Sequence, residues 1–194
     1  MAKVKGPLFS LGASGQIAKT LVYMTWKGID DVREYVIPAN PNTAGQQTQR
    51  GYFSAAVEAW HTDGYTALDV AAWNLYALAQ KVAASGFNMF TKLRVLADVA
   101  VHAWVTLTAV VISSITAAGA SVVVDVASDQ TGKLYIGTSK TSMFTEFSGA
   151  FDTDHYTFTL NGLSELTTYY FYIANEAASE DARTGIYTFK TIAA

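Results

Sequence analysis

Residues 35–50, YVIPANPNTAGQQTQR, mark a change from an extended pattern to a helical one. Pro38 and Pro41 fix their own backbone φ near about −65° and push the residues before them towards extended conformations. The Asn-Pro and Pro-Asn dipeptides favour turns. Thr43 and Gln46 have the spacing of a capping box, in which two side chains satisfy amide groups at the start of a helix. The stretch therefore predicts that an extended segment ends here and that a helix begins.

Before this stretch, residues 1–37 are rich in β-forming side chains. Residues 21–26, LVYMTW, and residues 32–37, VREYVI, flank a turn signal at residues 27–31. This pattern predicts a β-hairpin. Because an isolated hairpin is only marginally stable in water, we expect it to pack against the helices that follow or against another chain.

After this stretch, the apolar residues recur with helical spacing. Residues 44–62 are predicted to form a helix, because the apolar residues Phe53, Ala56, Val57 and Trp60 stand at i, i+3, i+4 and i+7 and mark its buried face. A second helix is expected from Thr66, its N-cap, to Gly86, which we expect in the left-handed conformation of a helix C-terminus. The short connection implies an antiparallel helical hairpin. Residues 87–97 have the spacing of a third helix.

From Thr106 onward the apolar residues alternate with polar ones. About seven short segments of this kind follow one another, separated by turn signals, within roughly 90 residues. That spacing is typical of a β-sandwich. The predicted fold is therefore an α+β N-terminal module, made of a β-hairpin and a helical hairpin, followed by an all-β sandwich. The predicted domains are residues 1–104 and residues 105–194.

Residues 156–173, YTFTLNGLSELTTYYFYI, resemble the segment that joins strands E and F of a fibronectin type III domain. Leu163, Thr167 and Tyr169 stand where that family has leucine, threonine and tyrosine, whereas Glu165 stands where it usually has proline. The tryptophan of an early strand in that family has no counterpart here. The resemblance implies a fibronectin type III-like sandwich, in which Tyr169 is the tyrosine-corner residue, with its ring packed and its hydroxyl bonded to the backbone.

The first half of the chain resembles a module of small proteins encoded by tailed bacteriophages. The resemblance lies in residues 15–23, GQIAKTLVY, residues 38–43, PANPNT, and residues 85–90, SGFNMF, among other positions. Joined to an immunoglobulin-like domain, it implies a structural protein of the virion, such as a capsid decoration protein, that forms homo-oligomers. Its expected partners are other copies of itself and other virion proteins. We expect synthesis in the host cytoplasm without a signal peptide, and no association with membranes.

The composition is compatible with such an assembly. The chain has 194 residues, of which 51% are hydrophobic and 15% are charged. A surface poor in charge fits a protein partly covered by other subunits, although a compact protein with a Thr/Ser-rich β surface fits as well. Residues 1–104 carry nine Lys and Arg against seven Asp and Glu, whereas residues 105–194 carry four against nine. This asymmetry suits an assembly with an inner and an outer face.

The sequence predicts no catalytic, cofactor or metal site. There is no cysteine, which excludes disulfides and thiolate chemistry. The three histidines are far apart and lack the spacing of metal ligands. Asp152 and Asp154, with Asp125 and Asp129, could hold a calcium ion, but aspartate is also common in turns, and we favour that interpretation. No nucleophile-elbow or phosphate-loop motif is present.

Aromatic and arginine side chains near the N-terminus form the candidate assembly interface, because such residues anchor protein interfaces. The candidates are Tyr23, Trp26, Arg33, Tyr35 and Arg50. The alternative is a nucleic-acid-associated protein that uses basic and aromatic side chains for phosphates and stacking. Asp30, Asp31 and Glu34 interrupt that basic surface, so we regard contact with nucleic acid as the weaker interpretation.

Tyr170 and Tyr172 form the candidate exposed surface of the sandwich. They alternate with Tyr169 along one predicted strand, so they should point away from the core if Tyr169 points into it. Exposed tyrosines could contact a glycan or a host surface, which makes a carbohydrate-binding or adhesive module the second alternative. They could instead pair across strands with Tyr187 and Phe189.

Overall fold

The computed structural model describes residues 3–4, 13–27, 29–37, 39, 42–81, 83–126, 132–175 and 181–194. The chain divides into two compact units, Met1–Thr43 and Ala44–Ala194. The helices and the β-rich half, which the sequence assigns to separate domains, therefore lie within one unit. The boundary between the two compact units follows Thr43, whereas the predicted domain boundary lies between residues 104 and 105.

The first unit contains a four-stranded antiparallel sheet with the strand order β1-β2-β3-β4. The strands are β1 (Lys3–Val4), β2 (Ala13–Ile17), β3 (Leu21–Trp26) and β4 (Ile29–Glu34). The predicted hairpin is present as β3–β4, paired from Leu21 opposite Glu34 to Trp26 opposite Ile29, but its second strand spans Ile29–Glu34 and not residues 32–37. Lys27, which follows β3, has a φ of 51°, in the left-handed region that two-residue hairpin connections require.

The second unit begins with the three predicted helices, α1 (Ala44–Thr62), α2 (Ala67–Ala79) and α3 (Gly86–Ala100). Thr66 is the N-cap of α2, as predicted, and its capping box is completed by Asp69. The role predicted for Gly86 is wrong, because this residue is the first of α3 and its N–H donates to Asn74 Oδ1 at 2.8 Å. A Cβ at Gly86 would lie 2.6 Å from the backbone nitrogen of Asn74, so the crossing of α2 and α3 requires glycine.

Two further four-stranded sheets follow, and all their pairings are antiparallel. One has the strand order β5-β6-β10-β9 and the other β12-β11-β7-β8. Together with the helices they give an α+β fold. The strands are β5 (Leu107–Ser113), β6 (Gly119–Val126), β7 (Gly132–Gly137), β8 (Thr145–Ser148), β9 (Ala150–Asp152), β10 (His155–Asn161), β11 (Thr168–Asn175) and β12 (Tyr187–Lys190).

These two sheets share one hydrophobic core. Buried side chains alternate with more exposed ones along the strands, as the period of two predicts. Val122 and Phe158 come from one sheet, whereas Leu134, Phe171 and Tyr187 come from the other, and all five belong to the same buried cluster. The two sheets therefore pack face to face.

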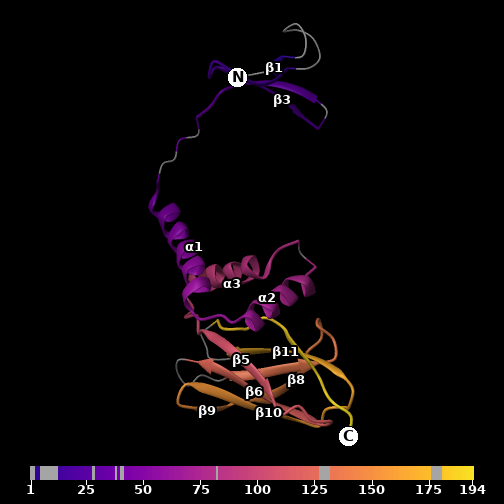
Figure 1. Cartoon of the computed structure of the whole chain (residues 1–194). Helices are drawn as coiled ribbons and strands as arrows, with labels where there is room; N and C mark the ends of the chain where they lie inside the picture. The colour runs from indigo at the N-terminus through magenta and orange to yellow at the C-terminus, as the bar shows by residue number, and fades with distance from the viewer. Residues whose placement is uncertain are drawn as a thin grey trace. The chain divides into compact units, whose positions relative to one another are not determined.

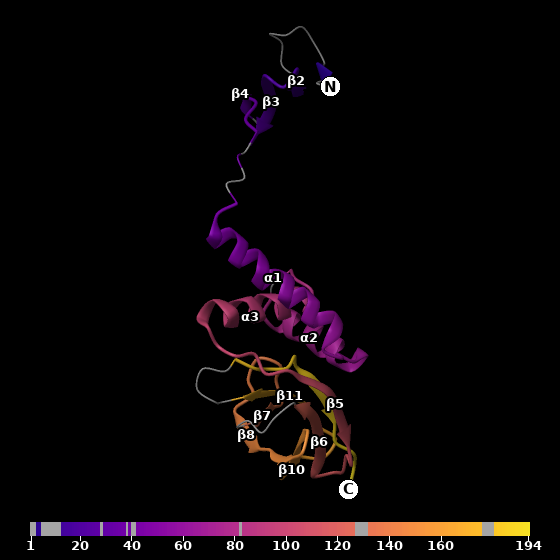
Figure 2. The same cartoon turned by 90° about the vertical axis from the view of Figure 1, so that its left-hand side faces the viewer.

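The helices form a second core against one side of the two sheets (Figures 1 and 2). Trp73, Tyr76 and Phe90 are buried in it together with Ile186, and Tyr170 of β11 packs against it. The Ile186 N–H donates to the Ala72 carbonyl oxygen at 2.9 Å, which joins α2 to the segment before β12. The helices thus cover part of the outer face of the sheet that contains β11.

Candidate assembly surface

The described side chains of the sheet β1-β2-β3-β4 form no buried core. Among the residues of the first unit whose side chains the structure describes, every one is exposed or half-buried. Leu21, Val32, Val36 and Ile37 are 40%, 51%, 70% and 73% exposed. A sheet is normally stabilised by burying at least one face against another element. The apolar side chains of this sheet are therefore available to be covered by a partner surface.

The exposed side chains lie on both faces of this sheet. Tyr23 is paired opposite Val32 and Leu21 opposite Glu34, and since side chains alternate along a strand, Leu21, Tyr23 and Val32 share one face. Val22 is paired opposite Arg33, which places these two on the other face. Tyr23 and Arg33, both predicted interface residues, thus lie on opposite faces of one sheet.

The face that carries Arg33 is hollowed. A hollow of about 500 Å³ is lined by Gly15, Gln16, Val22, Arg33, Glu34, Tyr35 and Val36. The Tyr35 N–H donates to the Thr20 carbonyl oxygen at 2.8 Å, which extends the β3–β4 pairing by one residue and holds Tyr35 at this hollow. A hollow lined by apolar side chains together with one cation and one carboxylate suits contact with a protein surface.

Two of the remaining predicted interface residues are Trp26 and Arg50. The backbone of Trp26 belongs to β3, but its side chain is outside what the structure describes. Arg50 lies on α1, in the other compact unit, and is exposed. Of the four candidates whose side chains the structure describes, it therefore brings Arg33 and Tyr35 together.

Helix α1 carries a second uncovered surface. Ala56 is its buried residue, and residues 44–55 are exposed except for Tyr52, which is half-buried. Phe53 is 55% exposed, although the helical spacing assigned it to the buried face. Phe53 lies before the part of α1 that packs on α3 through Trp60, whose ring centroid lies 5.7 Å from that of Phe87, so its side chain remains exposed to water.

The prediction that Tyr170 and Tyr172 form an exposed surface is wrong. Both side chains are half-buried, because α2 and α3 cover this part of the sheet. Tyr170 packs against the helical core and is paired opposite Thr188. The Tyr172 ring stacks on Tyr135, with 5.1 Å between the ring centroids. Neither tyrosine pairs with Tyr187 or Phe189, and the two do not form an aromatic platform.

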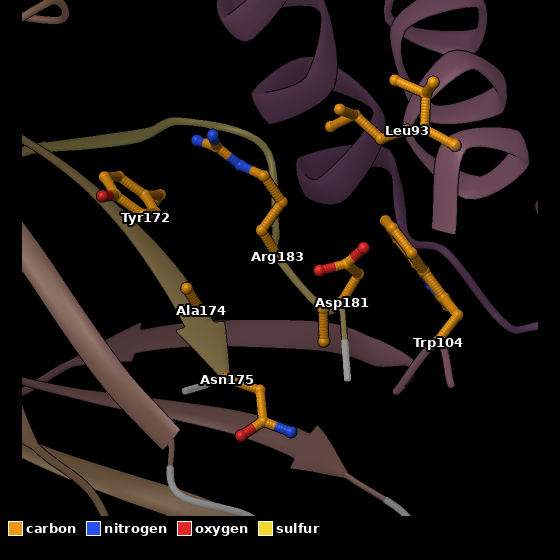
Figure 3. A pocket seen from close by; sticks show the side chains of 9 residues that line it. Leu93, Trp104, Tyr172, Ala174, Asn175, Asp181 and Arg183 are labelled. Atoms are coloured by element: carbon orange, nitrogen blue, oxygen red, sulfur yellow. The ribbon is translucent and has the colours of Figure 1, made fainter. Parts of the chain in front are cut away.

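Tyr172 borders a cavity of about 420 Å³ between α3 and β11, which Figure 3 shows from close by. The Arg183 guanidinium lies 4.5 Å from the ring centroid of Tyr172 and 4.4 Å from that of Tyr76. Its side chain points towards Tyr172 and away from Asp181 (Figure 3), whose carboxylate lies 3.1 Å from Nδ1 of His102. Burial lowers the pKa of Arg183. The Arg183 guanidinium and the Asp181 carboxylate therefore make contacts that join the helices to the sheet.

A buried carboxylate that the sequence analysis missed connects the helices to the sheets. Asp69 is 0% exposed. It accepts hydrogen bonds from the Thr66 N–H and hydroxyl at 2.8 Å, from the Ala109 and Val110 N–H groups at 3.0 and 3.4 Å, and from the Tyr187 hydroxyl at 2.6 Å. Burial, followed by the nearby charge of Asp69, raises the pKa of Tyr187, so Tyr187 remains a donor.

The geometry of β5 makes this arrangement possible. The register of β5 against β6 shifts between Thr108 and Val111, and Ala109 has a φ of 51°. Such a bulge redirects backbone groups out of the strand pairing, and here it releases two N–H groups to Asp69. The spacing of Thr66 and Asp69 is a sequence signal for the helix cap. No sequence pattern near Asp69 indicates that its carboxylate also accepts hydrogen bonds from β5 and β12.

The described residues contain no group of three His, Asp or Glu side chains that could hold a metal ion. Asp154 Oδ1 lies 2.9 Å from Nδ1 of His155, and this hydrogen bond raises the pKa of His155. Asp129, the fourth carboxylate weighed for calcium, lies outside the described residues. In the described part of the chain, no helix has both the length and the apolar character needed to cross a membrane.

Comparisons with known proteins do not place the chain in a family. No protein-family model and no curated protein matches it. Solved structures with a similar part include a myokine, at 18% identity and a TM-score of 0.38, covering 45% of this chain and 97% of the other. Another is the sensor domain of the anti-sigma factor RsgI4 of Pseudobacteroides cellulosolvens, at 21% identity and a TM-score of 0.35, covering 46% and 76%. Similarities this weak assign no function.

Proposed function

We propose that the protein is a structural subunit of a tailed-bacteriophage particle, such as a capsid decoration protein. In this proposal it assembles through its N-terminal sheet and displays its β-rich half. The observation that carries the proposal is the sheet β1-β2-β3-β4, whose described side chains are all exposed or half-buried. Covering apolar surface stabilises an assembly by about 25 cal/mol per Å², before the costs of association are subtracted. The proposal assigns the chain no catalytic role and no cofactor.

The displayed half is proposed to be a fibronectin type III-like, or immunoglobulin-like, sandwich. The strand order β5-β6-β10-β9 corresponds to A-B-E-D of that architecture when the strands are lettered in chain order. Tyr169 is buried near the start of β11, which corresponds to strand F. Its hydroxyl accepts a hydrogen bond from the Ser164 N–H at 2.8 Å, as expected for a tyrosine corner.

The two alternatives from the sequence have less support. A carbohydrate-binding surface depended on exposed rings at Tyr170 and Tyr172, which are half-buried. Contact with nucleic acid depended on a continuous basic surface. Arg33 instead shares its hollow with Glu34, and Asp31 is exposed on the same strand.

The proposal predicts that the protein is present in intact particles. Particles of the phage that encodes the chain would be purified by density gradient and analysed by quantitative mass spectrometry and by immunogold labelling with antibodies against the β-rich half. We expect many copies per particle and labelling of unopened particles. An abundant host cytoplasmic protein serves as the contamination control. Recovery in the lysate, together with depletion from the gradient band to the level of that control, would contradict the proposal.

A further inference from the structure

We infer that two copies of this chain pair through strand β4, antiparallel and about a twofold axis at Val32. This inference rests on the proposed assembly through the N-terminal sheet, and it identifies the partner and the register. Strand β4 stands at the end of the order β1-β2-β3-β4, so within the described residues β3 is its only neighbour. An edge strand presents backbone N–H and C=O groups that can pair with another chain.

The hydrogen-bond pattern of the hairpin determines which groups of β4 are free. The Tyr35 N–H donates to Thr20 O, so Thr20 and Tyr35 form a hydrogen-bonded pair. In an antiparallel ladder such pairs alternate with non-bonded ones. Arg33 and Asp31 therefore direct their backbone groups towards β3, whereas Val32 and Glu34 direct theirs outward. A second β4 strand can pair only in a register that sets outward-facing residues opposite each other.

Charge selects one register among those that remain. A twofold axis at Val32 places Asp31 of each copy opposite Arg33 of the partner subunit, which gives two pairs of opposite charge. An axis at Asp31 would place two aspartates opposite each other, and an axis at Arg33 would do the same with two arginines. Opposite charges in directly facing positions stabilise a strand pair and like charges destabilise it.

The side chains needed for this pairing are accessible. Asp31, Val32 and Arg33 are all exposed, and no ion pair involving Asp31 or Arg33 is found among the described residues. The same register sets Glu34 opposite position 30 of the partner, an aspartate in the sequence, so the pairing is strongest at its centre and weaker at its two ends. The two sheets would then form one continuous surface across the axis.

Charge exchange tests the register in the full-length protein. Sedimentation velocity would give the dimer dissociation constant. Asp31→Arg or Arg33→Asp alone creates two like-charge pairs and is expected to weaken dimerisation about tenfold or more. The double variant Asp31→Arg with Arg33→Asp exchanges the charges and is expected to restore dimerisation to within about threefold of the original. Lys19→Asp, which makes the same change in net charge as Arg33→Asp away from β4, is the matched control and should have no effect.

Disulfide trapping tests the axis independently. The chain has no cysteine, so Val32→Cys introduces a single thiol. Facing residues at the axis have Cα atoms about 5.5 Å apart, within the range that a disulfide spans. Mild oxidation is expected to convert Val32→Cys to a covalent dimer, whereas Leu21→Cys, on the same face but away from the edge, should remain monomeric under the same conditions.

The outcomes separate this inference from the proposed function. If the protein is found in particles but the single charge variants dimerise normally and Val32→Cys is not trapped, the β4 pairing is wrong and the virion proposal stands. If the double variant fails to recover dimerisation, the register is wrong. If the protein dimerises through β4 as described but is absent from particles, the pairing stands and the virion proposal fails.

Discussion

Replacing Asp69 with alanine is expected to lower the free energy of unfolding of the second unit by about 3–5 kcal/mol. The carboxylate is 0% exposed, and its removal leaves the Ala109 N–H and the Tyr187 hydroxyl without their acceptor. Each unsatisfied buried donor costs about 1–3 kcal/mol, and loss of the cap on α2 adds about 1 kcal/mol. Urea unfolding followed by tryptophan fluorescence, to which the buried Trp73 contributes, would measure the change.

Two further variants separate the contributions at this site. Tyr187→Phe removes one donor and keeps the ring, so we expect a smaller loss of about 1 kcal/mol. Asp98→Ala is the matched control, because Asp98 also lies on a helix but makes a half-buried pair with Arg94 at 3.7 Å, and it should cost less than about 1 kcal/mol. An Asp69→Ala protein as stable as the Asp98→Ala protein would show that Asp69 does not hold the helices to the sheets.

Replacing Gly185 with valine is expected to separate α2 from the segment before β12 and to cost about 3 kcal/mol or more. A Cβ at Gly185 would lie 2.6 Å from the Ala72 carbonyl oxygen and closer still to the peptide bond that follows it. The contact is with backbone on a buried helix, so neither side can move away without breaking the Ile186–Ala72 hydrogen bond. Thermal unfolding by circular dichroism would measure the loss.

Gly45→Ala is the control for this glycine substitution. Gly45 lies in α1 and has no atom within 4 Å of a Cβ placed on it, so alanine there should leave stability unchanged or raise it by about 0.5–1 kcal/mol. If Gly185→Val unfolds at the same temperature as the native protein, the close approach of α2 to the 182–187 segment is not required by the fold.

Local sequence patterns predicted the helices and most strands of the second unit, but only the hairpin within the four-stranded sheet of the first unit. Alternation in residues 121–126 and 167–174 predicted strands, and the apolar spacing of residues 44–62 predicted a helix, because side-chain periodicity follows directly from backbone geometry. The union of helices and sheets in one unit was not predictable in this way. This union depends on the hydrogen bonds of Asp69. Its partners Ala109 and Tyr187 lie 40 and 118 residues away from Asp69 in the sequence.

The candidate sites show the same limit. Alternation correctly predicted that Tyr170 and Tyr172 point away from the core that buries Tyr169, but it carries no information on what covers the outer face of a sheet, and α2 and α3 cover it. In contrast, the placement of Tyr23 and Arg33 on opposite faces follows from the β3–β4 register. To predict these faces from the sequence, one would need to know which residues form the turn. A shift of the register by one residue would move every side chain of the strand to the opposite face of the sheet.

The most direct test of the central claim, that the N-terminal sheet is completed by a partner, is amide hydrogen exchange in the full-length protein. Exchange of residues 13–37 would be compared between dilute monomer and assembled protein, with residues 119–126 of β6, which contribute to the core shared by the two sheets, as the internal reference. Few buried contacts imply a low local free energy of opening, so we predict rapid exchange of residues 13–37 in the monomer and protection on assembly, with residues 119–126 protected in both. Protection of residues 13–37 in the dilute monomer equal to that of residues 119–126 would contradict the claim.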